Sequence, residues 1–200
     1  MRISFSKKIQ LLLKISFLVT FAESMLVPMY AAFTEKVGGS ILDAAIAYGV
    51  FAIATGLAIG LVGTRQVFER HTWRFLIAGF MASVVCDLSY IFVQNKWQLF
   101  GVQVVAGLAS GLIEPAWDSL FTSGIKDSVA KHWSVWAGGT HFLSGVAAFA
   151  GGLIAAWSSF TVLFICMASI DALAVVLCLR GRLRQTSVDT TPKQDIGVAA

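Results

Sequence analysis

The sequence predicts an all-α membrane protein, a bundle of six transmembrane helices arranged as two inverted sets of three. The apolar runs, the placement of basic residues between them and the low charge content support this fold class. A hydrocarbon core about 30 Å thick requires about 20 apolar residues in each helix that crosses it. The expected spans are 9–33, 40–62, 74–93, 98–121, 135–157 and 160–179.

The composition is typical of a protein that lies mostly in lipid. Hydrophobic residues make up 57% of the chain, charged residues 13%, and the mean hydropathy is +0.78. A soluble domain carries about twice that share of charged residues. We therefore attribute the net charge of +4 to orientation in the lipid bilayer, and expect no nucleic-acid partner.

Lysine and arginine residues fall almost entirely on one side of the predicted membrane. Of the 15 in the chain, only Lys36 and Lys96 lie in gaps assigned to the opposite side. Basic residues near the ends of spans remain in the cytoplasm. We therefore expect a multi-pass protein of the cell (plasma or inner) membrane, with the N-terminus and the C-terminus in the cytoplasm.

Residues 1–184 are expected to form one six-helix transmembrane domain. The basic N-terminus resembles a signal peptide, but Lys14 interrupts the apolar run, which favours a retained first span. Residues 185–200 are polar and are expected to be a disordered cytoplasmic tail. Because each set has three spans, the second set crosses the membrane in the opposite orientation to the first. Such inverted repeats are common among secondary transporters.

Small residues recur at helical spacing within several spans. Such residues let helix backbones approach closely in lipid, where apolar burial gives helices little drive to associate. We interpret them as packing residues; an alternative is that smooth glycine faces let helices slide during a conformational cycle. The candidate packing residues are Gly56, Gly60, Gly107, Gly111, Pro115, Gly151 and Gly152.

Ionisable side chains inside the spans are the candidate proton-binding or substrate-binding residues. Such residues are costly in a membrane and usually face the bundle interior or a water-filled cavity. No lysine or arginine lies deep enough to pair with most of them, and an acid without a base in a low dielectric favours its neutral form. These groups suit proton coupling. The candidates are Glu23, Asp87, Glu114, His141 and Asp171.

The positions of these residues along their spans indicate two depths. Glu114, His141 and Asp171 are expected about 10–12 Å from the cytoplasmic surface at 1.5 Å per residue. Glu23 and Asp87 are expected near about 20 Å. Because spans four and five are sequential and antiparallel, Glu114 is expected to meet His141, either as a proton relay or as a static hydrogen bond that fixes packing.

Asp118 lies one helical turn after Glu114, near the cytoplasmic edge of span four. The loop between spans two and three carries Arg65 and Arg70. An ion pair between Asp118 and either arginine would join span four to that loop. We therefore expect these residues to form a gate or a structural latch.

Span four and its exit resemble the fourth helix of major facilitator superfamily transporters. In that family an Arg precedes a Gly by four residues, and a Gly-rich run and a Pro follow. Here Gly107, Gly111 and Pro115 match, while Gln103 stands at the position of the Arg.

Two further segments are similar to motifs of the same family. The loop after span two keeps Gly60, Arg65 and Arg70 of a Gly-x-x-x-Asp-Arg-x-Gly-Arg-Lys signature, with Thr64 and Val67 at the Asp and second Gly. Span five contains Gly151-Gly152, similar to a Gly-Pro-x-x-Gly-Gly element of antiporters. Ala147 and Ala148 replace the Gly-Pro of that element.

The resemblance covers about residues 9–184 and implies one half of a transporter that usually has twelve spans. It implies that span one lines a central cavity, which makes Glu23 a candidate for contact with substrate or proton. Spans three and six are peripheral in that family. Asp87 and Asp171 would therefore serve a homodimer contact or be rotated inward.

The function expected from this resemblance is secondary-active, proton-coupled transport of a small solute by a homodimer or by a paired half-size chain. The alternative is a non-transporting membrane subunit or scaffold that pairs with another half-transporter. An enzyme is not expected, because a metalloenzyme needs paired histidines and only His141 is embedded. No cofactor or metal is expected, and no residue pattern identifies the substrate.

Overall fold

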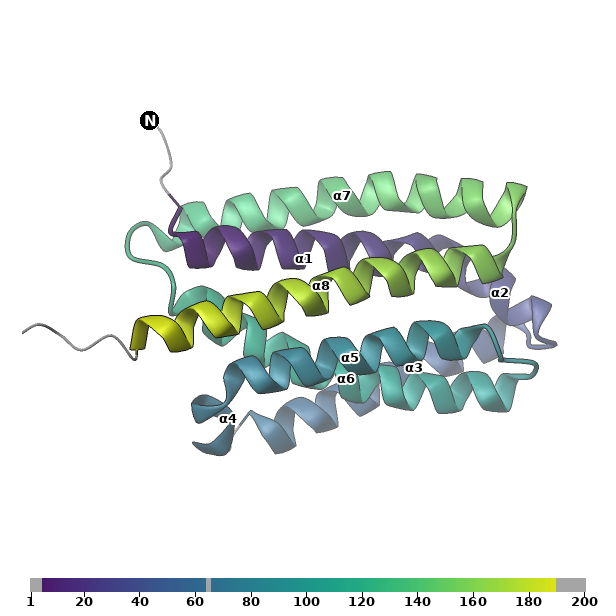
Figure 1. The fold of residues 1–200 in the computed structure, drawn as a ribbon. Coiled ribbons are helices and arrows are strands. Elements are labelled where there is room, and N and C mark those ends of the chain that lie inside the picture. Colours follow the sequence, from purple (N-terminus) through teal and green to yellow (C-terminus); the bar gives the residue numbers. More distant parts are fainter. Residues whose placement is uncertain (1–4, 64–65, 190–200) are drawn as a thin grey trace, which may run out of the picture.

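The computed structural model describes residues 5–63 and 66–189, with side chains except at 66–67 and 184–189. Within these residues six helices are long and apolar enough to cross a membrane, which confirms the six expected spans (Figure 1). α1, η1 and α2 together form the first of them. The elements are α1 Lys7–Leu26, the 3-10 turn η1 Val27–Met29, α2 Tyr30–Lys36, α3 Ile41–Val62, α4 Gln66–Arg70, α5 Thr72–Tyr90, α6 Lys96–Thr122, α7 Val129–Trp157 and α8 Phe160–Asp189.

Most helix ends lie within three residues of the expected positions, and three features differ more. The first span is interrupted at η1, which contains Pro28. Proline lacks an N–H, and in a continuous α-helix its ring would clash with the carbonyl group one turn earlier. α7 begins at Val129, before the expected residue 135. α8 continues to Asp189, so the first residues of the expected tail are helical. No glycine or proline occurs between Gly181 and Asp189 that would end the helix earlier. Residues 190–200 lie outside the description.

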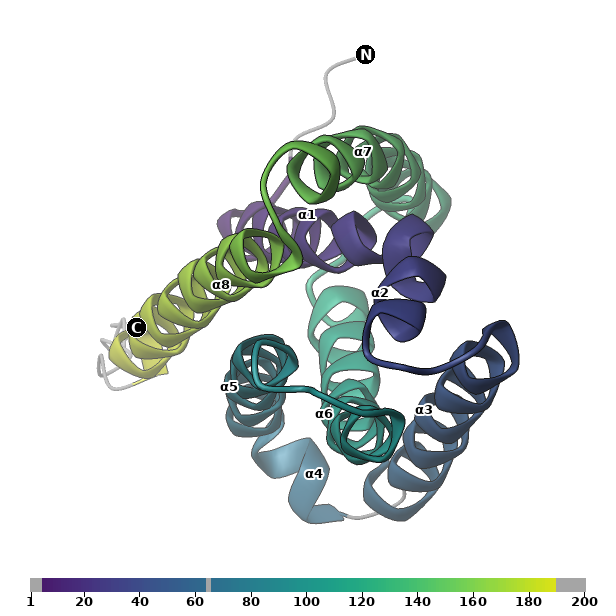
Figure 2. The ribbon, with the colours of Figure 1, turned by 90° about the vertical axis from the view of Figure 1, so that its right-hand side faces the viewer.

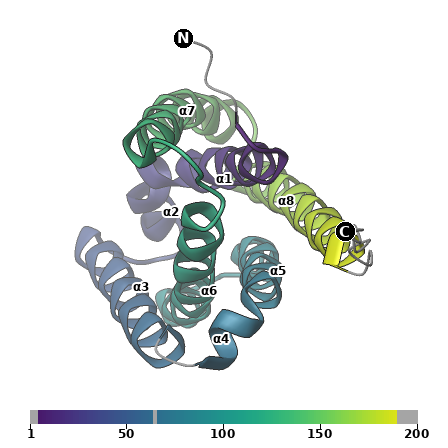
Figure 3. The same cartoon turned by 90° about the vertical axis from the view of Figure 1, so that its left-hand side faces the viewer.

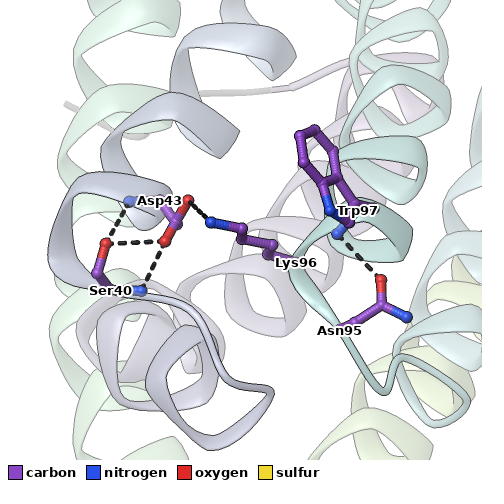
Figure 4. Close-up of polar contacts among 5 residues, drawn as sticks. All are labelled: Ser40, Asp43, Asn95, Lys96 and Trp97. Atoms are coloured by element: carbon purple, nitrogen blue, oxygen red, sulfur yellow. Dashed lines mark hydrogen bonds and ion pairs between the residues drawn. The ribbon is translucent and has the colours of Figure 1, made fainter.

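Polar caps hold the end of the bundle where α3, α6 and α8 begin, called here the far end. Ser40 and Asp43 form a capping box at the start of α3. Asn95 accepts hydrogen bonds from the backbone N–H groups of Trp97 and Gln98 at the start of α6. Lys96 Nζ pairs with Asp43 Oδ1 at 3.1 Å and joins the two helix starts (Figure 4).

The end-on views show α1 between α7 and α8, and α6 between α3 and α5 (Figures 2 and 3). The main packing pairs are α1–α7, α3–α6, α1–α8, α5–α6 and α5–α8. Exchanging α1 with α6, α3 with α7 and α5 with α8 leaves this set of pairs unchanged. The packing therefore agrees with the expected inverted repeat of three and three, and the bundle follows the order α7, α1, α8, α5, α6, α3.

Glycines occupy both closed and open helix faces. A Cβ at Gly107 would meet the Phe51 carbonyl of α3 at 2.5 Å, and one at Gly111 would meet Ala58 and the Thr55 carbonyl. Pro115 follows one turn later inside α6.

Gly151 lies against the backbone of Met25, so α7 approaches the end of α1 closely. A Cβ at Gly56, Gly60 or Gly152 meets no atom of the described residues within 4 Å. Gly56 and Gly152 therefore lie on helix faces that the other described helices leave uncovered.

The apolar core consists of two clusters. One lies toward the end where α1 begins and includes Leu12, Phe80 and Phe121. The other lies toward the far end and includes Phe33 and Phe164. Along α5, α6 and α8, an ionisable residue falls between the segments that contribute to the two clusters. A polar layer therefore lies between them.

Candidate functional site

A cavity of about 570 Å³ lies at the level of this polar layer. Its lining residues come from α1, η1, α2, α3, α5, α6 and α8. The volume falls within the range of about 300–1,000 Å³ that is usual for small-molecule pockets. The turn at η1 contributes Val27, so the interruption of the first span forms part of the wall.

Four carboxylic acids from four different helices line the cavity: Glu23 of α1, Asp87 of α5, Glu114 of α6 and Asp171 of α8. Glu23 is close enough to Glu114, Asp87 and Asp171 for electrostatic interaction. Asp87 and Asp171 also interact with each other. The structure thus brings together every acid that was expected to bind a proton or substrate.

These four acids differ in their access to the cavity. Glu23 and Glu114 are exposed, and both line the cavity. Asp87 is 7% exposed and Asp171 is 1% exposed. Asp87 Oδ2 and Asp171 Oδ1 have no hydrogen-bond partner among the described residues. Because most buried polar groups are hydrogen-bonded, these two oxygen atoms require an explanation.

A hydrogen-bonded group of neutral side chains lies on the far-end side of the cavity. Gln103 Nε2 donates to the hydroxyl oxygen of Tyr30 at 2.5 Å and to that of Tyr90 at 3.0 Å. The ring of Tyr90 stacks on Phe164 with 5.1 Å between centroids. Gln103 therefore connects α2, α5 and α6 and fixes the position of both tyrosines.

Tyr30, Tyr90 and Gln103 line the cavity but were not predicted as site residues. A usable signal was present, because buried tyrosine hydroxyl groups usually require a hydrogen-bond partner. Gln103 is a polar side chain in an otherwise apolar stretch of span four. Neither signal identifies which residues on different helices meet.

Among the described residues that line the cavity there is no lysine, arginine or histidine. No group of three or more potential ligands in the described chain is arranged to hold a metal ion. The cavity therefore offers acidic and hydroxyl groups on an otherwise apolar wall. Its titratable groups are Glu23, Tyr30, Tyr48, Cys86, Asp87, Tyr90, Glu114 and Asp171.

His141 does not join these acids. It is exposed on α7 and is absent from the cavity lining in the described structure. α6 and α7 are not a main packing pair, and the end-on views place α1 between them. Trp117 of α6 does contact Trp136 of α7, with 5.0 Å between centroids, close to the end where α1 begins. The expected neighbourhood of Glu114 and His141 rested on sequence order, which does not determine which helices pack together.

The remaining predicted residues concern orientation and the latch. Asp87 and Asp171 line the cavity, so they are rotated inward within this bundle. Asp118 is exposed and interacts electrostatically with Glu114. The described residues show no ion pair between Asp118 and Arg70, and Arg65 lies outside the description. The latch stays a prediction.

Comparisons with known proteins agree with this architecture. The model of the Major Facilitator Superfamily matches residues 12–199. The chain is also similar to the "uncharacterized MFS-type transporter YitZ" of Bacillus subtilis (strain 168). The two are 29% identical over 149 residues, which cover 72% of this chain and 88% of the relative.

Proposed function

This chain belongs to the Major Facilitator Superfamily, and from that premise we propose that it is a secondary-active, proton-coupled transporter of a small solute. The observation that carries the proposal is the convergence of four acids on one cavity whose described lining contains no basic side chain. Acidic side chains at membrane depth commonly mark proton relays and substrate paths.

The proton-coupling proposal rests on the contrast between the two accessible and the two buried acids. A buried carboxylate without a partner is costly, and binding a proton removes its charge. Glu23 lies within electrostatic reach of the other three acids and is itself exposed. We therefore assign Glu23 as the group through which protons reach Asp87 and Asp171.

We further propose that the transporter works with a second six-span bundle, a second copy of this chain or another half-size chain. α3 and α7 are the ends of the helix order, are not a main packing pair, and are the least buried spans. Open glycine positions occur on both, at Gly49 and Gly56 of α3 and at Gly138 and Gly145 of α7. Such faces suit close helix contacts in lipid.

Native mass spectrometry and crosslinking in lipid test this partnership. A second copy predicts a dimer that Gly145→Leu disrupts, whereas Gly101→Leu, at another position with open space around it on α6, leaves the dimer intact. Transport at full rate by a single chain per liposome contradicts the requirement for a second bundle.

We also propose that the protein lies in the cell membrane with both termini in the cytoplasm. The support is the distribution of lysine and arginine, of which only Lys36 and Lys96 lie in gaps of the opposite side. Accessibility of single introduced cysteines in intact cells checks this orientation. Labelling of a cysteine at Lys96 and protection of one at Lys126 are the expected results.

A proton-flux assay in liposomes that contain the purified chain tests transport itself. A panel of neutral, anionic and cationic solutes is added across an imposed pH gradient. We expect one class of solute to drive proton flux. Glu23→Gln is expected to abolish this flux, and Asp43→Asn is expected to retain it, because Asp43 does not line the cavity. Absence of flux with every class, by a correctly folded dimer, would favour the non-transporting subunit or scaffold.

A further inference from the structure

We propose that the cavity binds an organic cation with a bulky apolar or aromatic body. The four carboxyl groups hold its charge, and the aromatic wall holds its body. This inference rests on the proposed function, since it names the class of cargo that such a transporter carries. It concerns binding, however, and is measured without transport.

The charge of the cargo follows from the lining. Glu23, Asp87, Glu114 and Asp171 supply four acids, and the described lining supplies no basic side chain. Clefts lined by charges of one sign within low-dielectric walls concentrate ligands of the opposite sign. An anion would have no cationic partner here. Asp87 and Asp171, both more than nine-tenths buried, offer acceptor oxygen atoms that the described residues leave unpaired.

Neutral polar solutes fit this lining less well than a cation does. A sugar-like solute needs several hydrogen-bond donors and acceptors around it. The amide of Gln103 is already bonded to the hydroxyl groups of Tyr30 and Tyr90. Ser83 and Ser110 also offer hydroxyl groups, but the buried side-chain atoms without a hydrogen-bond partner among the described residues are Asp87 Oδ2 and Asp171 Oδ1. A positively charged cargo satisfies them.

The size of the cation follows from geometry. A small metal ion needs several ligands that converge on one point, and the described chain has no group of three such residues. The acids instead come from four helices around a cavity of about 570 Å³. A volume of this kind accommodates a drug-sized molecule. The charge of the cargo is therefore best spread over, or embedded in, a larger organic body.

The aromatic residues of the wall fit that body. Tyr30, Tyr48, Phe51 and Tyr90 line the cavity from α2, α3 and α5. Aromatic faces attract organic cations, and desolvated sites strengthen the attraction. Tyr30 and Tyr90 are held in place by Gln103, so two of the four rings are positioned before a ligand arrives.

Binding of tetraphenylphosphonium by the purified full-length chain in lipid nanodiscs tests the proposal. Tetraphenylborate is the matched control, because it has nearly the same size and shape and the opposite charge. We expect saturable binding of tetraphenylphosphonium and only non-saturable partitioning of tetraphenylborate into lipid. Asp87→Asn with Asp171→Asn is expected to weaken tetraphenylphosphonium binding by more than about tenfold, and Asp43→Asn is expected to leave it unchanged.

Three results would overturn the inference: no saturable binding of tetraphenylphosphonium, equal saturable binding of both ions, or unchanged affinity in the double variant. If the double variant does not fold, Glu23→Gln with Glu114→Gln replaces it, since these side chains are exposed. Proton-coupled flux of an anionic or neutral solute without tetraphenylphosphonium binding overturns this inference alone. Tetraphenylphosphonium binding by a chain that moves no solute instead contradicts the proposed transport.

Discussion

The acid Asp43 at the far end of the bundle and the buried acids of the middle layer differ in their hydrogen-bond and ion-pair partners. Asp43 Oδ2 accepts hydrogen bonds from the Ser40 backbone N–H at 2.9 Å and from the Ser40 hydroxyl group at 2.8 Å. Its Oδ1 pairs with Lys96 at 3.1 Å (Figure 4). Asp87 and Asp171 are more deeply buried, and each has a carboxyl oxygen without a partner among the described residues.

This difference separates structural acids from acids that serve a ligand. Asp43 completes a helix start and needs nothing further, so its contribution is to stability. An unpaired buried carboxyl group contributes no such stabilisation and costs free energy. The presence of such a group in a cavity beside two accessible acids is explained if a proton or a cation binds its unpaired oxygen atom during function.

The largest effect is expected in the middle layer. Asp171→Asn keeps the shape of the side chain but removes its charge and its ability to exchange a proton. We expect transport to fall at least about tenfold, equal to about 1.4 kcal/mol, with thermal stability unchanged or increased. Asp43→Asn is the matched control, and we expect it to retain transport. Equal transport by the two variants in proteoliposomes would remove the distinction between the two settings.

A smaller effect is expected at Gln103. Gln103→Leu introduces an apolar side chain of similar size and leaves the hydroxyl groups of Tyr30 and Tyr90 without their donor. We expect the free energy of unfolding to fall by about 1 kcal/mol and the affinity for cavity ligands to fall with it. Unfolding of the purified protein by denaturant in mixed micelles measures the first quantity. An unchanged midpoint would show that the hydrogen-bonded group does not position the cavity wall.

A still smaller effect is expected from the ion pair at the far end. Lys96→Met leaves Asp43 with both hydrogen bonds from Ser40 and removes a partly exposed ion pair. We expect a small loss in the free energy of unfolding, because exposed ion pairs contribute little to stability, with transport retained. The same unfolding assay at low and high salt measures it. Loss of transport in a stable Lys96→Met protein would give this pair a functional role.

No coupling is expected between Glu114 and His141, which the fold does not bring together. The effects of Glu114→Gln and His141→Asn on transport are expected to add within about 0.3–0.5 kcal/mol. Glu114→Gln and Glu23→Gln, by contrast, should deviate from additivity by more than about 0.5 kcal/mol, because these acids interact across the cavity. Additive effects for Glu114 and Glu23, together with non-additive effects for Glu114 and His141, would support a proton relay between Glu114 and His141 instead.

Hydropathy was sufficient to predict the number of spans, because it depends on local composition. The same information placed Glu23, Asp87, Glu114 and Asp171 inside spans but expected them at two depths, whereas in the structure all four line one cavity. It could not give their convergence, since the face of a helix that meets a given neighbour is decided by packing between distant segments. His141 shows this limit, because it was expected at the depth of Glu114 but its helix packs on α1.

The arrangement around Gln103 was also beyond the sequence. Its amide meets Tyr30 and Tyr90 because η1 and α2 continue the first span beyond Pro28 and α5 packs on α6. These contacts join three helices, so the residue periodicity within any one helix cannot predict them. The polar character of each residue was visible, but the partnership was not.

The central claim is that the same carboxyl groups serve protons and cargo. Proton release on addition of tetraphenylphosphonium to the purified protein, in weakly buffered solution with a pH indicator, tests this claim most directly. We predict release from the wild-type chain between about pH 5 and 8, because a bound cation favours the charged form of the acids beside it, and less release from the Asp87→Asn and Asp171→Asn double variant. Saturable binding without proton release throughout this range, or equal release from the double variant, would contradict the account.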